Sequence, residues 1–208
     1  MLYPVRWFGK VVTPFRQLPV VSSATAPVLL IGGWTVAAAL QPVGFDPLRD
    51  TISALAGHGA AHRWVMTVAL LGVGLCHVVT TLGLRALATP GRVMLAAGGV
   101  ATVLVAAFPL PATGSSVAHQ LAATTAFACL ALWPALGRVP GGAPQPIPAA
   151  LLRGATAVLS ALVVLFCLAL AAGVLVGLAE RLAAGAQALW PLATVIILRR
   201  TTGVSGPR

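Results

Sequence analysis

The sequence predicts an all-α membrane protein, a polytopic bundle of six transmembrane helices with a short helix on its outer surface. Hydrophobic residues make up 59% of the 208 residues, only 8% are charged, and the mean hydropathy is +0.98. A soluble domain carries roughly 25% charged residues, so this composition indicates a bilayer environment. It excludes a disordered tail, a secreted disulfide scaffold and a DNA-binding module, although the net charge is +10.

Windows without charged residues locate the helices, because a charge at the bilayer centre costs about 2.5–3.5 kcal/mol. One span needs about 20 residues. The window 93–137 therefore holds two spans, and the Pro-containing segment 109–116 divides it. The six predicted helices cover residues 26–43, 64–84, 93–109, 116–137, 150–178 and 181–198.

The basic residues predict the orientation. With a cytoplasmic N-terminus, ten of the thirteen Lys and Arg residues fall on the inner side, as the positive-inside rule requires. Both termini are then cytoplasmic in the plasma (inner) membrane: a basic N-terminal segment (1–24), a six-helix membrane domain (25–200) and a tail (201–208). The expected partners are the lipid bilayer and a membrane protein or a second copy, with no nucleic acid.

The segment 46–57 carries the signals of the short surface helix. Asp46 suits the N-cap, Pro47 the first helical position, and Gly57 the terminator. Spacings of i, i+4 and i+7 place three apolar residues on one face: Leu48, Ile52 and Leu55. We therefore expect a helix that lies on the membrane surface or folds over the mouth of the bundle.

All three acidic residues fall on the predicted outer side. The positive-inside rule accounts for an uneven distribution of basic residues between the two sides, but not of acidic residues. The location of all three acids on one side therefore indicates a candidate site at an outer mouth of the bundle. Gln187 lies seven residues after Glu180 on the same helix face and extends polarity about 10 Å inward. The candidate binding residues are Asp50, Ser53, His119, Glu180 and Gln187.

The same residues also have structural interpretations. Asp46 and Glu180 can serve as helix caps. Asp50 can form an ion pair with an arginine of the same side, namely Arg49, Arg63 or Arg181. Sequence alone leaves both interpretations open.

The four histidines differ in their contexts. His58 and His62 have a metal-binding spacing, but flanking glycines favour an exposed loop. We expect no metal and no cofactor; the alternative is a metal set of His58, His62, His119 and Asp50. His119 follows the N-cap candidate Ser116 and can bind a ligand or the Pro-rich turn. His77 lies deep in the second helix, roughly 15 Å from the depth of His119, and is interpreted as a hydrogen-bonded packing residue.

Several runs resemble a known family: 46–55, 63–66 and 72–77, together with Phe108-Pro109 and His119. It comprises six-helix bacterial integral membrane proteins, common in actinobacteria, that are classified only as a domain of unknown function. The resemblance covers roughly residues 25–200, implies six spans, and implies no substrate or cofactor.

A second similarity is to membrane-embedded zinc hydrolases of the ceramidase and adiponectin-receptor type, which combine Ser, His and Asp near one membrane face. Those proteins have seven helices and an H-x-x-x-H pair in the last one, whereas the last helix here has no histidine.

The sequence supplies no complete set of nucleophile, base and oxyanion donors and no closed set of metal ligands. It therefore favours a non-enzymatic membrane protein, either a small-solute or lipid-handling carrier or an accessory membrane subunit. The alternative is a membrane-embedded, metal-dependent (zinc) lipid hydrolase of the ceramidase-like type.

Overall fold

A computed structural model describes residues 6–7, 10–11, 14–139 and 145–203. Two short strands, β1 (Arg6–Trp7) and β2 (Lys10–Val11), pair in an antiparallel manner. The helices are α1 (Pro14–Ala39), α2 (Ile52–Ala56), α3 (Trp64–Thr81), α4 (Thr89–Ala107), α5 (Val117–Leu136), α6 (Ala149–Ala172) and α7 (Val176–Gly203).

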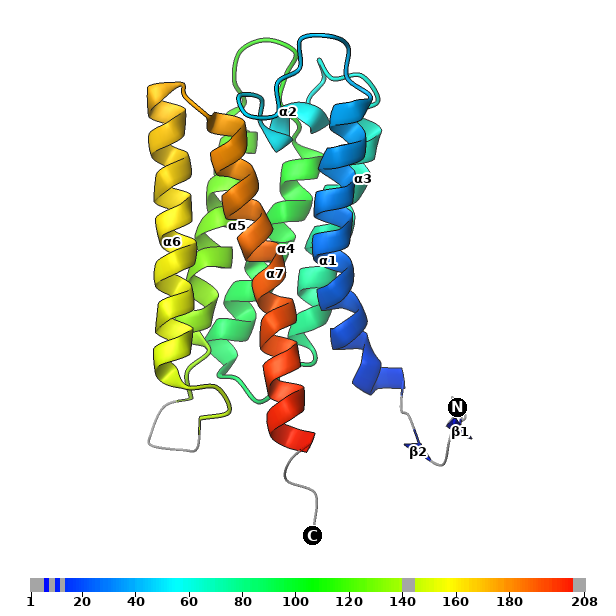
Figure 1. Cartoon of the computed structure of the whole chain (residues 1–208), viewed down its shortest axis with the longest axis vertical. Coiled ribbons are helices and arrows are strands. Elements are labelled where there is room, and N and C mark those ends of the chain that lie inside the picture. Colours follow the sequence, from blue (N-terminus) through cyan, green and yellow to red (C-terminus); the bar gives the residue numbers. More distant parts are fainter. Residues whose placement is uncertain (1–5, 8–9, 12–13, 140–144, 204–208) are drawn as a thin grey trace.

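The six long helices form a ring in which each packs against the next: α1, α3, α4, α5, α6, α7 and again α1. Successive long helices run in opposite directions (Figure 1). Because their number is even, the start of α1 and the end of α7 lie at the same end of the bundle. The short helix α2 lies at the opposite end, called the α2 end below.

Five of the helices are long and apolar enough to cross a membrane: α1, α3, α4, α6 and α7. Large apolar side chains are exposed on their outer faces, for example Val28, Leu75, Val100 and Leu168. The chain is thus a multi-pass membrane protein with an all-α fold, as predicted. Helix α5 is not among the five, since polar residues such as His119, Gln120 and Thr124 lower its hydropathy. The sixth span stays a prediction.

The predicted boundaries of the first and the last two helices are wrong. Helix α1 covers Pro14–Ala39 rather than 26–43, because a helix can continue beyond the charge-free window. Helix α6 ends at Ala172 rather than at 178, and α7 begins at Val176 rather than at 181. The turn between them uses Gly173, whose φ of 66° lies in the left-handed region that glycine adopts at helix ends.

The predicted surface helix exists but is shorter than the segment 46–57. It begins at Ile52, and the N-cap is Thr51, whose Oγ1 accepts the Ala54 N–H at 3.0 Å. Asp46 instead closes a turn before the helix, where its Oδ1 accepts the Leu48 N–H at 2.9 Å. Gly57 ends α2 as predicted.

The buried apolar residues form two main clusters. One surrounds α2 and includes Leu30, Ile52 and Leu55, while the other lies nearer the opposite end around the fully buried Trp133. The interior between them is not completely filled, because side chains of both clusters line one cavity.

Candidate functional site

The cavity lies inside the ring beneath α2 and has a volume of about 60 Å³. That volume has room for about two water molecules at about 30 Å³ each. Most of its lining is apolar and includes Leu30, Leu70, Val105 and Phe127. The polar part of the lining consists of Ser53, His77, Thr102, Glu180 and Gln187.

Glu180 connects the cavity to the helix that covers it. Its side chain is buried, with 3% exposed, and both carboxylate oxygens accept a hydrogen bond from the start of α2. One oxygen accepts the main-chain N–H of Ile52, and the other accepts the hydroxyl of Ser53 at 3.0 Å. Since α7 begins at Val176, four residues earlier, Glu180 does not cap its own helix. It caps α2 from the neighbouring helix.

Gln187 and Thr102 are buried, and each donates one hydrogen bond to a backbone carbonyl. The Nε2 of Gln187, a residue with 1% exposed, donates to the Phe127 carbonyl at 2.9 Å. The Oγ1 of Thr102 donates to the Gly98 carbonyl at 2.9 Å. The oxygens of both side chains therefore retain capacity to accept further hydrogen bonds.

His77 completes the polar lining from α3. Its side chain is buried, with 1% exposed, and Nδ1 has no hydrogen-bond partner among the described residues. A buried ring nitrogen without a partner is uncommon, because desolvation of a polar atom costs about 1–3 kcal/mol when no bond replaces water. The interpretation of His77 as a simple packing residue does not account for this atom.

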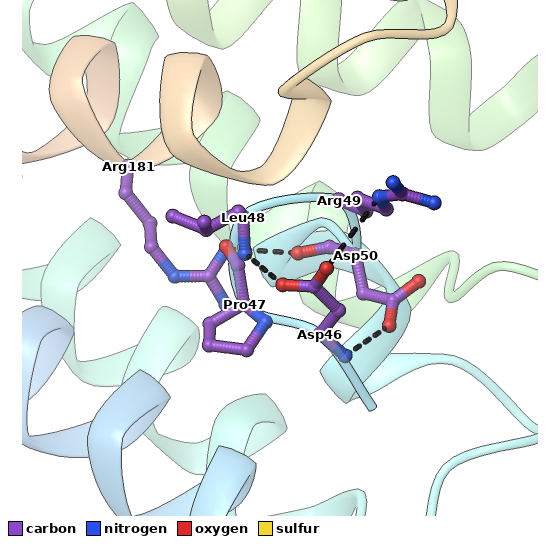
Figure 2. A network of polar contacts seen from close by, with 6 residues as sticks. All are labelled: Asp46, Pro47, Leu48, Arg49, Asp50 and Arg181. Carbon is purple, nitrogen blue, oxygen red and sulfur yellow. Dashed lines mark hydrogen bonds and ion pairs between the residues drawn. The ribbon is translucent and has the colours of Figure 1, made fainter. Parts of the chain in front are cut away.

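The structure divides the five predicted mouth residues into two groups. Ser53, Glu180 and Gln187 line one cavity together. Asp50 lies on the other side of the loop, where its Oδ2 accepts the Asp46 N–H at 2.8 Å (Figure 2). It lines a separate open pocket of about 520 Å³ with residues such as Gln41.

His119 is also away from the cavity lining. Ser116 is the N-cap of α5, as predicted, and its Oγ accepts the His119 N–H at 3.3 Å. The Nδ1 of His119 makes a hydrogen bond of 2.9 Å to the Phe108 carbonyl, at the start of the Pro-rich turn. This contact ties the end of α4 to the start of α5.

Arg181 holds the loop before α2 against α7 (Figure 2). Its Nη1 donates to the carbonyls of Pro47 at 2.7 Å, Asp50 at 2.8 Å and Gly177 at 2.9 Å. The predicted ion pair of the Asp50 carboxylate with an arginine does not form among the described residues, since Arg181 bonds to the main-chain oxygen of Asp50. The carboxylate of Asp46 instead approaches Arg49 at 3.5 Å.

Gly177 permits this close packing. A Cβ at this position would lie 2.6 Å from the Pro47 carbonyl oxygen and 2.8 Å from the Arg181 Nη1. Both distances are too short for a carbon atom, so any side chain here would displace the loop or the arginine.

The alternative metal set is not brought together. His58 and His62 are exposed in the loop between α2 and α3, and the His58 N–H donates to the Leu110 carbonyl at 2.8 Å. Within the described ranges, no three His, Cys, Asp or Glu side chains are placed to hold one metal ion.

Sequence reasoning missed His77 and Thr102 as cavity residues. A signal for His77 was present, because an ionisable residue deep in a membrane helix marks a functional site more often than a packing position. Thr102 carried no such signal, since threonine in a membrane helix commonly bonds to its own helix.

A family model described as "Protein of unknown function (DUF998)" matches residues 24–197. No curated protein and no solved structure matches the chain.

Proposed function

The chain belongs to the DUF998 family of proteins of unknown function, and we propose that it is a carrier that moves a small solute through the cavity beneath α2. One observation carries this proposal. The carboxylate of Glu180 is buried inside a membrane bundle, lines a cavity, and at the same time binds the helix that covers that cavity.

Burial of a carboxylate inside a membrane bundle is costly, and such residues mark substrate or ion pathways. A simple scaffold gains the same helix–helix contact from apolar side chains without this cost. The carboxylate of Glu180 instead has two roles. It lines the cavity, and it binds α2, which covers the cavity. A solute that binds the carboxylate acts on the same group that holds Ile52 and Ser53, which couples binding to movement of the cover.

The proposal includes the topology. We propose that α5 is the sixth span, that the α2 end faces outward, and that both termini are cytoplasmic in the inner membrane of a bacterium. The charge distribution supports this orientation. Arg85, Arg92, Arg153 and Arg199 lie toward the end opposite α2, whereas all three acidic residues lie at the α2 end.

Two exposed positions test the orientation: His58→Cys at the α2 end and Arg138→Cys after α5. Both variants are made in a background without the free cysteines Cys76, Cys129 and Cys167. We expect an impermeant thiol reagent to modify the first variant in intact cells and the second only after the cytoplasm is opened. The reverse pattern contradicts the orientation.

Access to the cavity from both sides of the membrane tests transport without knowledge of the solute. The variant Ala184→Cys places a thiol in the cavity lining. In proteoliposomes, we expect a charged, impermeant thiol reagent to modify it when supplied from either side. The matched control retains only Cys167, which is exposed on α6 toward lipid, where a charged reagent does not reach it.

If the protein is instead an accessory subunit, we expect a different result. A bundle that only supports a partner keeps its interior closed, so the thiol at position 184 stays unmodified from both sides. Modification from the α2 side alone indicates a receptor site. Either result contradicts the carrier.

A further inference from the structure

We propose that the solute is a small primary ammonium ion with a short apolar tail. The proposal rests on the cavity being the binding site of the carrier. It follows from the hydrogen-bonding capacity, the charge and the size of the cavity, taken together.

The hydrogen-bonding capacity of the lining is mainly that of an acceptor. A carboxylate has about four acceptor positions, and Glu180 uses two of them on α2. The hydroxyl hydrogens of Ser53 and Thr102 and one amide hydrogen of Gln187 are committed to Glu180 or to backbone carbonyls. The imidazole of His77 presents an acceptor nitrogen or an N–H according to its tautomer. The lining thus fits a ligand with several N–H donors.

The charge of the lining favours a cation. Among the described residues, Glu180 is the one acidic residue in the lining, and none of the lining residues is lysine or arginine. The adjacent Arg181 attracts the Glu180 carboxylate electrostatically, but its Nη1 donates to the carbonyls of Pro47, Asp50 and Gly177. A buried carboxylate is stabilised further by a cation at hydrogen-bond distance, and a bound ammonium ion supplies one.

The size and apolarity of the cavity define the rest of the ligand. A volume of about 60 Å³ corresponds to about two water-sized groups at about 30 Å³ each. Apolar side chains dominate its surface, so a hydrated metal ion fits less well than an amine with a very short alkyl tail. Phe127 lines the same cavity, and an aromatic ring attracts a cation that lies over its face.

A direct binding measurement tests this ligand class. Radiolabelled n-propylammonium is equilibrated with the full-length protein in phosphatidylcholine nanodiscs, and bound label is measured by dialysis. We expect saturable binding that 1-propanol and tetramethylammonium do not displace, because the first lacks the charge and the second lacks N–H donors. Displacement by either compound as efficient as by unlabelled n-propylammonium overturns the proposal.

The variant Glu180→Gln should weaken n-propylammonium binding by at least about tenfold, because a hydrogen bond to a charged group is lost. The matched control Asp50→Asn removes an acid at the same end of the molecule outside the cavity lining, and should stay within about twofold of wild type. Thr102→Val leaves the contacts of α2 intact and should weaken binding about fivefold, so the test holds even if Glu180→Gln does not fold. Unchanged binding in both cavity variants overturns the proposal.

A primary ammonium group also occurs in the headgroup of phosphatidylethanolamine. A second set of nanodiscs that contain this lipid distinguishes the two sources. Reduced n-propylammonium binding in these nanodiscs assigns the site to the lipid headgroup, and unchanged binding assigns it to a free amine. Both results retain the ammonium chemistry, and absence of saturable binding in both sets of nanodiscs overturns it.

Failure of this inference is distinguishable from failure of the carrier. If Ala184→Cys is modified from both sides but n-propylammonium does not bind, the carrier proposal stands and the ligand proposal is overturned. If n-propylammonium binds but Ala184→Cys is modified from one side only, the ligand proposal stands and the carrier proposal is overturned.

Discussion

The loop between α1 and α3 has two sides whose polar groups have different neighbours. On the cavity side, Ser53 meets the buried Glu180 above an interior space lined by His77 and Gln187. On the other side, Asp46 and Asp50 bond mainly to the loop itself, and Asp50 lines an open pocket. The acids look alike in the sequence, yet the apolar face of α2 separates them.

The acidic residues differ in their contacts because the short helix α2 lies between them. Ile52, Leu55 and Ala56 of α2 are buried; Ile52 lines the cavity, whereas Leu55 lines the open pocket on the other side. Asp46 and Asp50 then shape the cover, whereas Glu180 belongs to both the cover and the cavity. Substitutions on the two sides should therefore have effects of different size.

The largest effect is expected for Glu180→Ala. It leaves the Ile52 N–H and the Ser53 hydroxyl without their acceptor, so the free energy of unfolding should fall by about 2–4 kcal/mol. Asp50→Asn retains an oxygen that accepts the Asp46 N–H and should cost about 0.5 kcal/mol or less. Equilibrium unfolding in mixed detergent and SDS micelles compares the two. Equal losses would contradict the division of the loop.

Gly177→Ala should have the next largest effect. The added methyl group collides with the Pro47 carbonyl and the Arg181 guanidinium, so the loop has to shift at a cost of about 1–3 kcal/mol. Gly154→Ala in α6 is the matched control, because no atom lies within 4 Å of its Cβ position. We expect this control to be neutral or slightly stabilising. Limited proteolysis of the loop should increase for the first variant only.

Arg181→Gln tests the other attachment of the loop to α7. Its Nη1 reaches three carbonyls, and loss of these bonds should cost about 1–2 kcal/mol. The control is Arg49→Gln, since the side chain of Arg49 is 81% exposed and its pair with Asp46 contributes little. A melting midpoint that falls as far for Arg49→Gln as for Arg181→Gln would show that the buried contacts of Arg181 are not decisive.

The smallest effect is expected outside the loop, at the start of α5. Ser116→Ala removes the N-cap of α5 and should cost about 1 kcal/mol. The neighbouring Ser115 is exposed, so Ser115→Ala should have no measurable effect on the melting midpoint. A loss of stability for Ser116→Ala as large as that for Glu180→Ala would contradict the expectation that contacts on the cavity side of the loop contribute most.

The sequence was sufficient to predict the six long helices, because composition and charge position alone specify where a bilayer admits them. It was insufficient for the turn at Gly173, since Glu180 and Arg181 suggested a loop where they lie inside α7. Charged residues interrupt a span in hydropathy terms, but a helix retains them when neighbouring elements supply partners.

The candidate site was predictable only in part. Ser53, Glu180 and Gln187 share one cavity because Gln187 follows Glu180 by two turns and Ser53 lies in the first turn of α2. His77 and Thr102 join them through the packing of α3 and α4 around the ring, which no spacing within one helix reveals. Asp50 and His119 were placed in the mouth by depth alone, and depth does not determine the direction of a side chain.

Filling the cavity tests the central claim, that this interior space is where the solute binds. Ala123 lines the cavity from α5, and Ala123→Leu occupies the space without touching the contacts of Glu180 with α2. The control Ala157→Leu lies on the exposed face of α6. We predict that both variants fold with melting midpoints near that of wild type and that only Ala123→Leu loses n-propylammonium binding. Undiminished binding by folded Ala123→Leu would contradict the account.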